Sequence, residues 1–205
     1  MPHCGIVILA AGGSSRMGVP KQSLQFEGST LLLRAVDTAI SSVCRPIVVV
    51  LGAGAEEFEK ALLGKPVKVA VNSNWSAGMG TSIRAGVSAL GYSEIDAVMI
   101  FLCDQPLIPA SMLNHMVSMH FAKAAPITAA FYADTFGTPV IFSASLFDEL
   151  LSLQDQQGGK TVLARHPNQV TGIQLPEAEV DVDTMDDFNR LTTKPRLHQA
   201  RNDGD

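Results

Sequence analysis

Four apolar runs, of which the third is interrupted by Lys68, most constrain the fold of this chain, and each is followed by a turn and then by a helical pattern; they span residues 6–9, 46–51, 67–71 and 97–102. A run without polar alternation is typical of a strand that is buried on both faces of a parallel sheet. Parallel neighbours need a crossover connection, usually a helix, and helical patterns cover residues 31–41, 55–63 and 82–90. The sequence therefore predicts an α/β fold of three layers, α/β/α, around a mostly parallel, Rossmann-like sheet.

The pattern changes in the C-terminal half. A strand is expected over residues 127–131, and a second short apolar run at 137–142 follows it after only a turn. Because a short turn joins antiparallel neighbours, this spacing predicts an antiparallel excursion from the parallel sheet. The other elements expected in this half are helices over 111–121, 146–153, 160–165 and 185–191, and strands over 169–175 and 180–182.

The composition limits the function classes. The 205 residues are 46% hydrophobic with a formal net charge of -5, and no Lys/Arg run is interleaved with aromatic residues, which argues against a nucleic-acid-binding surface. The three cysteines lack CxxC or Cys/His metal spacing, which favours buried free thiols in a reducing compartment. The N-terminal apolar run is too short for a signal peptide or a membrane span, so we expect a cytoplasmic protein without a membrane partner.

The first apolar run ends in a loop of small residues that two cations follow. Residues 10–15 carry almost no side-chain bulk, so successive backbone N–H groups can close around an anion. Arg16 adds a planar fork suited to phosphate oxygens, and Lys21 adds a mobile point charge. The glycines do not have the spacing of a P-loop or of a Rossmann turn. The loop therefore predicts phosphate binding, the alternative being a glycine turn with two solvated cations; its nucleotide-binding candidates are Leu9, Ala10, Ala11, Gly12, Gly13, Arg16 and Lys21.

Carboxylates stand where two other apolar segments end. Asp104 follows the run at 97–102, at the edge of the expected sheet that also carries the phosphate loop, and open parallel sheets bind ligands at that edge. Asp181 and Asp183 alternate with valines, so both carboxylates project from one face of a short strand. A hard cation such as Mg2+, held by Asp104 and one of these two acids together with a triphosphate, would explain them. The alternatives are a helix cap or turn for Asp104 and a solvated edge strand for the other two.

A polar loop, NSNWSAGMGTS, follows the third apolar run at residues 72–82. It offers amide, hydroxyl and backbone groups together with two glycines, which suits recognition of a nucleobase edge in a shaped slot. Asn72, Gly78 and Ser82 are its nucleotide-binding candidates. The alternative is an ordinary connecting loop in which Trp75 covers the core.

Four motifs together resemble those of the MobA-like nucleotidyltransferase family, and within it the branch of molybdenum cofactor cytidylyltransferases. They are LAAGGSSRMGVPK at 9–21, NSNWSAGMGTSI at 72–83, CDQP at 103–106 and DVDTMDDF at 181–188. The resemblance implies the fold of nucleotidyltransferases and nucleotide-diphospho-sugar transferases, as one domain over residues 1–192. It implies a nucleotide-binding half at 1–110 and an acceptor-binding half at 111–192. The polar, apolar-poor composition of residues 193–205 predicts a disordered tail.

The resemblance also implies roles for single residues. Arg16 and Lys21 would contact the phosphates, and Gly78 and Ser82 would lie near the base or ribose. Mg2+ (or Mn2+) would bind Asp104 together with Asp183. The motifs GTPV at 137–140 and QQGGK at 156–160 would lie on the acceptor side.

The expected reaction is transfer of CMP from CTP to the phosphate of molybdenum-molybdopterin, with release of pyrophosphate and with Arg16, Lys21 and Asp104 as catalytic residues. One alternative keeps the chemistry but uses GTP or another NTP, or a sugar or polyol phosphate as acceptor. Another is a non-catalytic nucleotide- and cofactor-binding module that delivers cofactor. The expected protein partner is a molybdenum hydroxylase or its chaperone.

Overall fold

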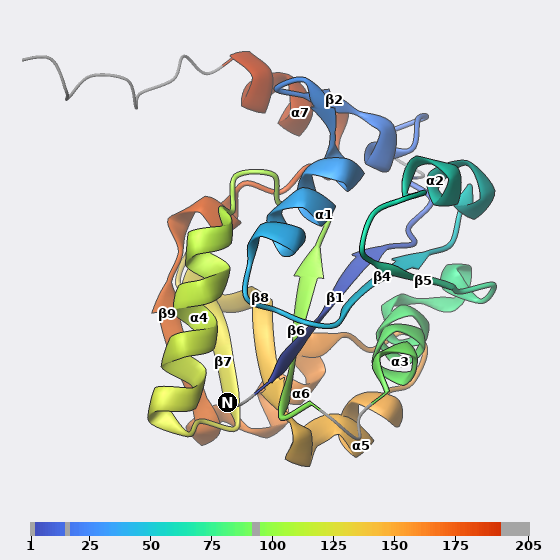
Figure 1. Ribbon diagram of the computed structural model, residues 1–205. Coiled ribbons are helices and arrows are strands. Elements are labelled where there is room, and N and C mark those ends of the chain that lie inside the picture. Colours follow the sequence, from blue (N-terminus) through green and yellow to red (C-terminus); the bar gives the residue numbers. More distant parts are fainter. Residues whose placement is uncertain (1–2, 15–16, 92–94, 194–205) are drawn as a thin grey trace, which may run out of the picture.

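A seven-stranded sheet in the order β5-β4-β1-β6-β8-β7-β9 forms the centre of the computed structural model, which describes residues 3–14, 17–91 and 95–193 (Figure 1). Within these residues all neighbouring strands of the sheet run parallel except β8, which is antiparallel to both β6 and β7. The predicted parallel sheet and its antiparallel excursion are therefore confirmed. The strands are β1 (Cys4–Ala10), β4 (Ile47–Leu51), β5 (Lys68–Val71), β6 (Ala97–Leu102), β7 (Ile127–Tyr132), β8 (Thr135–Ser143) and β9 (Val170–Gln174), and a separate hairpin consists of β2 (Gln25–Phe26) and β3 (Ser29–Thr30).

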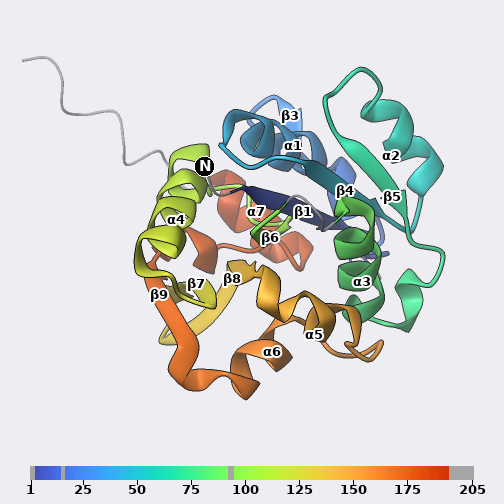
Figure 2. The ribbon, with the colours of Figure 1, turned by 60° about the horizontal axis from the view of Figure 1, so that its bottom comes forward.

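Helices cover both faces of the sheet (Figure 2). In β1 successive side chains alternate between two cores, so Ile6 and Ile8 pack with α1, α2 and α4 while Val7 and Leu9 pack with α3, α5 and α6. All seven residues of β1 are buried, as expected for a central strand covered on both sides. The helices are α1 (Leu31–Ser41), α2 (Ala55–Ala61), α3 (Met79–Leu90), α4 (Ala110–Lys123), α5 (Phe147–Leu151), α6 (Gly159–Arg165) and α7 (Met185–Thr193).

A third, smaller core joins the two ends of the described chain. Met17, Phe26, Leu31 and Val182 are buried together, and Phe188 and Leu191 of α7 pack against them. The helix α7 consequently lies beside the β2–β3 hairpin (Figure 1). This contact carries residues 180–184 back across the molecule to the carboxyl edge of the sheet.

The strand predicted over residues 180–182 is wrong. Val182 is buried and Asp181 is exposed, as the alternation predicts. Among the described residues, however, the segment has no neighbouring strand. Its amide at Val182 instead donates to the carbonyl of Asp104 at 3.0 Å. The helix predicted over 82–90 begins earlier, at Met79, and the one over 146–153 is a 3-10 turn followed by the shorter α5.

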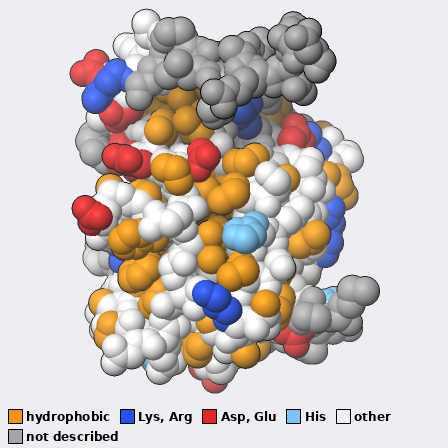
Figure 3. Space-filling model, turned by 90° about the vertical axis from the view of Figure 1, so that its left-hand side faces the viewer, with side chains coloured by type: hydrophobic (Ala, Val, Ile, Leu, Met, Phe, Trp, Pro, Cys, Tyr) orange, Lys and Arg blue, Asp and Glu red, His pale blue; other side chains and the backbone are white. Residues whose placement is uncertain are grey.

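The three cysteines and His120 are buried in the fold. Cys4, Cys44 and Cys103 are free and buried, which confirms that prediction. His120 is buried, with Nδ1 lying 3.0 Å from the hydroxyl of Thr128 and Nε2 lying 3.2 Å from that of Ser143. Among the described residues no helix combines the length and the apolar character needed to cross a membrane. The face seen in Figure 3 mixes scattered apolar side chains with acidic and a few basic ones.

Candidate nucleotide and metal site

The carboxyl ends of the central parallel strands bring the predicted loops together. In the register of the sheet, Leu9 of β1 is paired with Leu102 of β6, and Ala10 with Leu51 of β4. The loops that follow these strands, residues 11–14, 52–54 and 103–106, therefore leave the sheet side by side. The antiparallel strand β8 begins near the same edge, so its GTPV segment joins them.

Lys21 lies between two of the predicted carboxylates. Its Nζ is 2.5 Å from Oδ2 of Asp104 and 3.2 Å from Oδ1 of Asp183. The lysine and Asp104 side chains are 17% and 11% exposed, so this ion pair is largely shielded from water. Three residues that are far apart in the sequence thus meet at one point beyond the ends of β1 and β6.

The local charges perturb the groups around this point. Burial alone would lower the pKa of the Lys21 ammonium, but the carboxylates of Asp104 and Asp183 outweigh it and raise that pKa above the usual range of lysine. Burial, helped by the charge of Asp104, raises the pKa of the Cys103 thiol to about 12. Burial, and then the charges of Asp183 and Asp104, also raise the pKa of the Asp181 carboxyl. The cluster has more acids than Lys21 can neutralise, and it is therefore suited to a further cation.

The residues present fit a divalent metal. Within the part of the chain that the structure describes, Oδ1 of Asp104 is buried without a hydrogen-bond partner, and such an acceptor gains from a cation. The ammonium of Lys21 occupies the point where two carboxylates converge, as a cation would. Within the described ranges no group of three or more His, Cys, Asp or Glu side chains has the arrangement of a metal site. Magnesium usually takes one or two carboxylates and completes its shell with water and substrate phosphates, so a site built on Asp104 and Asp183 matches that habit.

Gln22, a residue that the sequence analysis did not single out, supports the loop after β1 through hydrogen bonds. The buried amide nitrogen Nε2 of Gln22 donates to the carbonyls of Ala10 and Gly12, both at 2.8 Å. The hydroxyl of Ser14 accepts from the backbone N–H of Lys21 at 2.9 Å and so ties the end of the loop to the lysine. A methyl group built on Gly12 would meet no atom of the described residues within 4 Å, so these residues leave the space in front of this backbone open. Arg16, the second predicted cation, lies outside the described residues.

Trp75 joins the phosphate loop to the polar loop at 72–82. A methyl group on Gly13 would come within 2.7 Å of the indole ring, and one on Gly52 would meet the same side chain at 2.7 Å. The ring therefore covers two glycines at the ends of β1 and β4. This arrangement agrees in part with the expected role of Trp75 as a cover for the core, against which it also packs.

Asn72 organises its own loop. Its Nδ2 donates to the hydroxyls of Thr81 (2.8 Å) and Ser82 (3.0 Å), while its Oδ1 accepts from the N–H of Asn74 (3.0 Å). These bonds join the first residue of the loop to the first turns of α3. Asn72, Thr81 and Ser82 are all buried, so the loop is a fixed structure.

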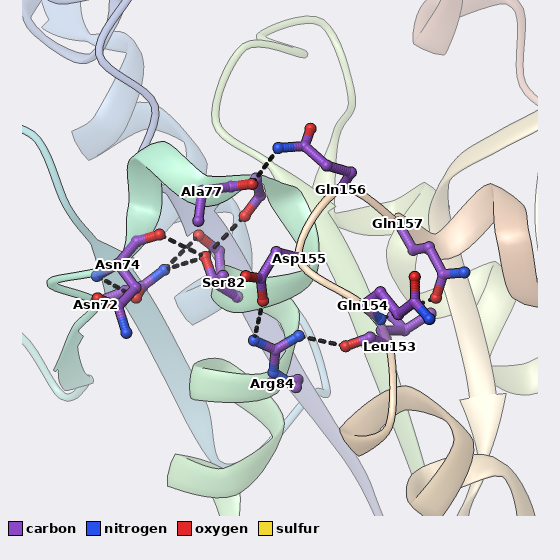
Figure 4. Close-up of polar contacts among 12 residues, drawn as sticks. Asn72, Asn74, Ala77, Ser82, Arg84, Leu153, Gln154, Asp155, Gln156 and Gln157 are labelled. Carbon is purple, nitrogen blue, oxygen red and sulfur yellow. Dashed lines mark hydrogen bonds and ion pairs between the residues drawn. The ribbon is translucent and has the colours of Figure 1, made fainter.

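A turn formed by residues 154–157 lies against this loop (Figure 4). The carbonyl of Asp155 accepts from the N–H of Gly80 at 2.9 Å, and its carboxylate lies 2.6 Å from Nη2 of Arg84. The turn contains the first two residues of the QQGGK motif. The structure therefore places this motif beside the predicted base-side loop.

Gln105 and Tyr132 lie beside the GTPV segment, which is predicted to face the acceptor. Gln105 donates through Nε2 to the carbonyls of Thr138 (2.9 Å) and Ala178 (3.0 Å), and so connects the CDQP turn with the GTPV segment. A methyl group on Gly137 would come within 2.2 Å of the hydroxyl of Tyr132. Burial, with the charge of Asp181, raises the pKa of that phenol. Gln105 belongs to the CDQP motif, whereas Tyr132 stands apart from the predicted motifs, so the sequence offers a signal only for Gln105.

Comparison with known proteins identifies the family. Residues 6–170 match the model of the MobA-like NTP transferase domain. The chain is 30% identical over 196 residues to nicotine blue oxidoreductase of Paenarthrobacter nicotinovorans, covering 90% of this chain and 94% of the relative. It is 29% identical over 174 residues to purine catabolism protein PucB of Bacillus subtilis (strain 168), covering 79% and 81%.

A solved structure agrees with this match. The crystal structure of Rv0371C from Mycobacterium tuberculosis H37Rv in complex with manganese is 26% identical, with a TM-score of 0.78 over 94% of this chain and 99% of that one. The shared fold, the matched residues and the loops at the sheet edge lead to one assignment. The chain belongs to the MobA-like NTP transferase family, a family of nucleotidyltransferases.

Proposed function

We propose that this protein transfers CMP from CTP to the phosphate of molybdenum-molybdopterin and releases pyrophosphate. The observation that carries the proposal is the position of Lys21 between Asp104 and Asp183, next to an open loop of small residues. This arrangement offers a cation for a triphosphate and acids for a metal at one point. The motifs that resemble molybdenum cofactor cytidylyltransferases support the choice of CTP and of the acceptor.

The chain's own groups would act by position and charge. An oxygen of the acceptor phosphate attacks the α-phosphorus of the nucleotide, the bond to the β-phosphate oxygen breaks, and pyrophosphate leaves with that electron pair. Lys21, together with Arg16 and the backbone N–H groups of residues 10–14, would stabilise charge on the triphosphate and on the leaving group. No covalent enzyme intermediate is required.

Asp104 and Asp183 are the residues proposed to hold Mg2+ or Mn2+. When bound, the cation would neutralise the charge of the phosphates. The manganese complex of Rv0371C supports a divalent cation in this family. We assign Asp183 rather than Asp181 because its carboxylate shares Lys21 with Asp104.

The two substrates are proposed to use different halves of the chain. Leu9, Ala10, Ala11, Gly12 and Gly13 would line the triphosphate, and the loop that Asn72, Gly78 and Ser82 shape would face the base. Residues 111–192 would contribute the acceptor side through the GTPV segment and the 154–157 turn. A molybdenum hydroxylase or its chaperone would then receive the product.

The name of the Paenarthrobacter relative raises a redox alternative for this chain. A nicotinamide dinucleotide usually binds a GxGxxG turn with an acid at the end of the next strand. Here Gly12, Gly13 and Gly18 have another spacing, and β4 ends at Leu51 before Gly52. The nucleotidyl reaction is therefore the better supported one, and NADH and NADPH belong in the assay as a direct comparison.

A pyrophosphate-release assay tests the proposal. It compares CTP, GTP, ATP and UTP, each with Mg2+ and with or without molybdopterin, and we expect release with CTP that depends on the acceptor. Asp104→Ala is expected to abolish the release while the circular dichroism spectrum stays unchanged. Release at the wild-type rate in this variant would sink the assignment of the site. Release with another NTP or with a sugar phosphate alone would redirect the substrate assignment, and binding without any release would favour the delivery module.

A further inference from the structure

The turn of residues 154–157 is fastened to the start of α3 by contacts that the chemistry itself does not need (Figure 4). Arg84 of α3 bonds both the carboxylate of Asp155, at 2.6 Å, and the carbonyl of Leu153. The N–H of Gly80 donates to the carbonyl of Asp155, and the amide of Gln156 donates to the carbonyl of Ala77. Three donors, which are the guanidinium of Arg84, the N–H of Gly80 and the side-chain amide of Gln156, therefore make four bonds between residues 153–156 and residues 77–84.

The two glycines of the SAGMG segment leave the room that this contact needs. A methyl group on Gly78 would lie 2.2 Å from the carbonyl oxygen of Asp155, and one on Gly80 would lie 2.1 Å from that of Gln154. Gly78 also has a φ of 139°, which side chains rarely adopt. The loop at 72–82, whose sequence suggests base binding, thus also forms the surface against which the 154–157 turn packs.

The same loop reaches the phosphate loop on its other side. Trp75 packs against Gly13, and Asn72 holds both ends of the loop together. Residues 10–14, 72–82 and 154–157 therefore form one continuous wall. One end of it is the loop proposed to bind the triphosphate, and the other is the turn assigned to the acceptor side.

We propose that Arg84 and Asp155 are positioning residues whose ion pair holds the base-side loop and the acceptor-side turn as one unit. The inference rests on the proposed function and adds that both substrates depend on the same pair. Loosening the pair lets the 154–157 turn leave Gly78 and Gly80, so that neither the base slot nor the acceptor slot keeps its shape. Neither residue touches the reacting atoms.

If the ion pair of Arg84 and Asp155 had only a structural role, its loss would lower the melting temperature and leave substrate binding unchanged. The side chains of Arg84 and Asp155 are 31% and 54% exposed, and an ion pair so exposed adds little to stability. Its loss should therefore leave the melting temperature nearly unchanged. The effect expected from positioning is on substrate binding.

Steady-state kinetics separate the two roles. In Arg84→Met and in Asp155→Asn, the KM for the nucleotide and the KM for the acceptor should each rise about tenfold while kcat at saturation stays within about twofold. Arg84→Lys, which keeps a cation, should restore most of the binding. Arg165→Met is the matched control, because Arg165 forms a comparable exposed pair with Glu149 at 2.9 Å. Unchanged KM values in Arg84→Met, or an equal rise in the control, would overturn the inference.

Trp75 supplies a binding readout that does not need turnover. It is the single tryptophan of the chain, so intrinsic fluorescence reports on the wall directly. Titration with Mg-CTP should give a dissociation constant that is about tenfold weaker in Arg84→Met than in the wild type. A wild type that binds nucleotide and a variant that matches it would overturn this inference alone. A wild type that neither binds nor turns over nucleotide would overturn the proposed function together with it.

Discussion

Lys21 and Asp104 form an ion pair with a separation of 2.5 Å between Nζ and Oδ2, although 83 positions separate them in the chain. The ammonium occupies the space between Asp104 and Asp183 in which a divalent cation would be held. A metal at the proposed site would therefore compete with Lys21 for the same carboxylates. A triphosphate would relieve this competition, since it offers Lys21 other anionic partners.

Replacing Lys21 by Met should consequently affect metal and nucleotide in opposite directions. In the absence of nucleotide, Mn2+ should bind tighter by about tenfold, which corresponds to about 1.4 kcal/mol. Pyrophosphate release should fall by about 100-fold or more, because one charge on the triphosphate is lost. Electron paramagnetic resonance of free Mn2+ measures the first quantity. Lys65→Met, which removes the partner of the exposed Asp37, serves as the control, and weaker Mn2+ binding in Lys21→Met would contradict the competition.

Gly12→Ala should impair binding without affecting the fold. Among the residues with a described placement, the added methyl group meets no atom within 4 Å, and Gly12 is outside the left-handed region, so the free energy of unfolding should change by no more than about 0.5 kcal/mol. The methyl group would, however, fill the space that a phosphate needs near the backbone. We expect the affinity for Mg-CTP to fall about tenfold in a fluorescence titration. A variant that binds as well as the wild type would show that the loop does not face the phosphates.

Gly86→Ala should destabilise the fold without impairing nucleotide binding. Gly86 lies where α3 packs on the sheet, and a methyl group there would come within 2.3 Å of Val7 Cγ1 and 2.9 Å of Val50 Cγ2. Overpacking of this kind costs about 1–3 kcal/mol, of which the better helix propensity of alanine returns only part. Urea denaturation should show a lower midpoint with an unchanged slope. The Val7→Ala/Gly86→Ala double variant should recover part of the loss, and the absence of such coupling would argue against this helix–sheet contact.

His120 should make the stability depend on pH. Burial lowers its pKa to about 4, whereas the ring in the unfolded chain has a pKa of about 6.5. Between these values the unfolded state binds the extra proton, so the contribution of His120 is complete above pH 6.5 and is lost as the pH falls towards 4. The loss amounts to at most about 3 kcal/mol.

Urea denaturation at pH values from 7 to 4.5 measures this dependence. His120→Gln, which can still bond Thr128 and Ser143 but carries no titrating ring, should lose this part of the slope. The difference between wild type and variant removes the contribution of the carboxylates. An equal pH dependence in both proteins would show that the ring is not held neutral.

The central sheet could be predicted because its strands need no knowledge of their neighbours. The runs at 6–9 and 97–102 are apolar on both faces, short and bounded by turns, and this combination is typical of a doubly covered parallel strand. The segment at 180–182 misled the prediction for the opposite reason. Alternation is common to a strand and to any extended segment with one buried face, and the pairing partner that distinguishes them is not in the local sequence.

The site follows the same division. Lys21 and Asp104 could be placed at one edge because each follows a predicted strand of the same sheet. Gln22 and Arg84 could not, because their contacts are with the backbone of other segments. A glutamine in a loop or an arginine on a helix is usually solvated, and only the fold shows which carbonyl it reaches.

The third core has a consequence for how the protein is made. Val182 is buried against residues near the N-terminus, and Asp183 meets Lys21 across 162 positions of chain. A growing chain can pair β1, β4 and β6 long before residue 183 is synthesised, because contacts close in sequence form with less loss of entropy. Until then Lys21 has one carboxylate of the pair and not the other. The sheet is thus able to form before residue 183 is made, whereas the cluster of Lys21, Asp104 and Asp183 can be completed only afterwards.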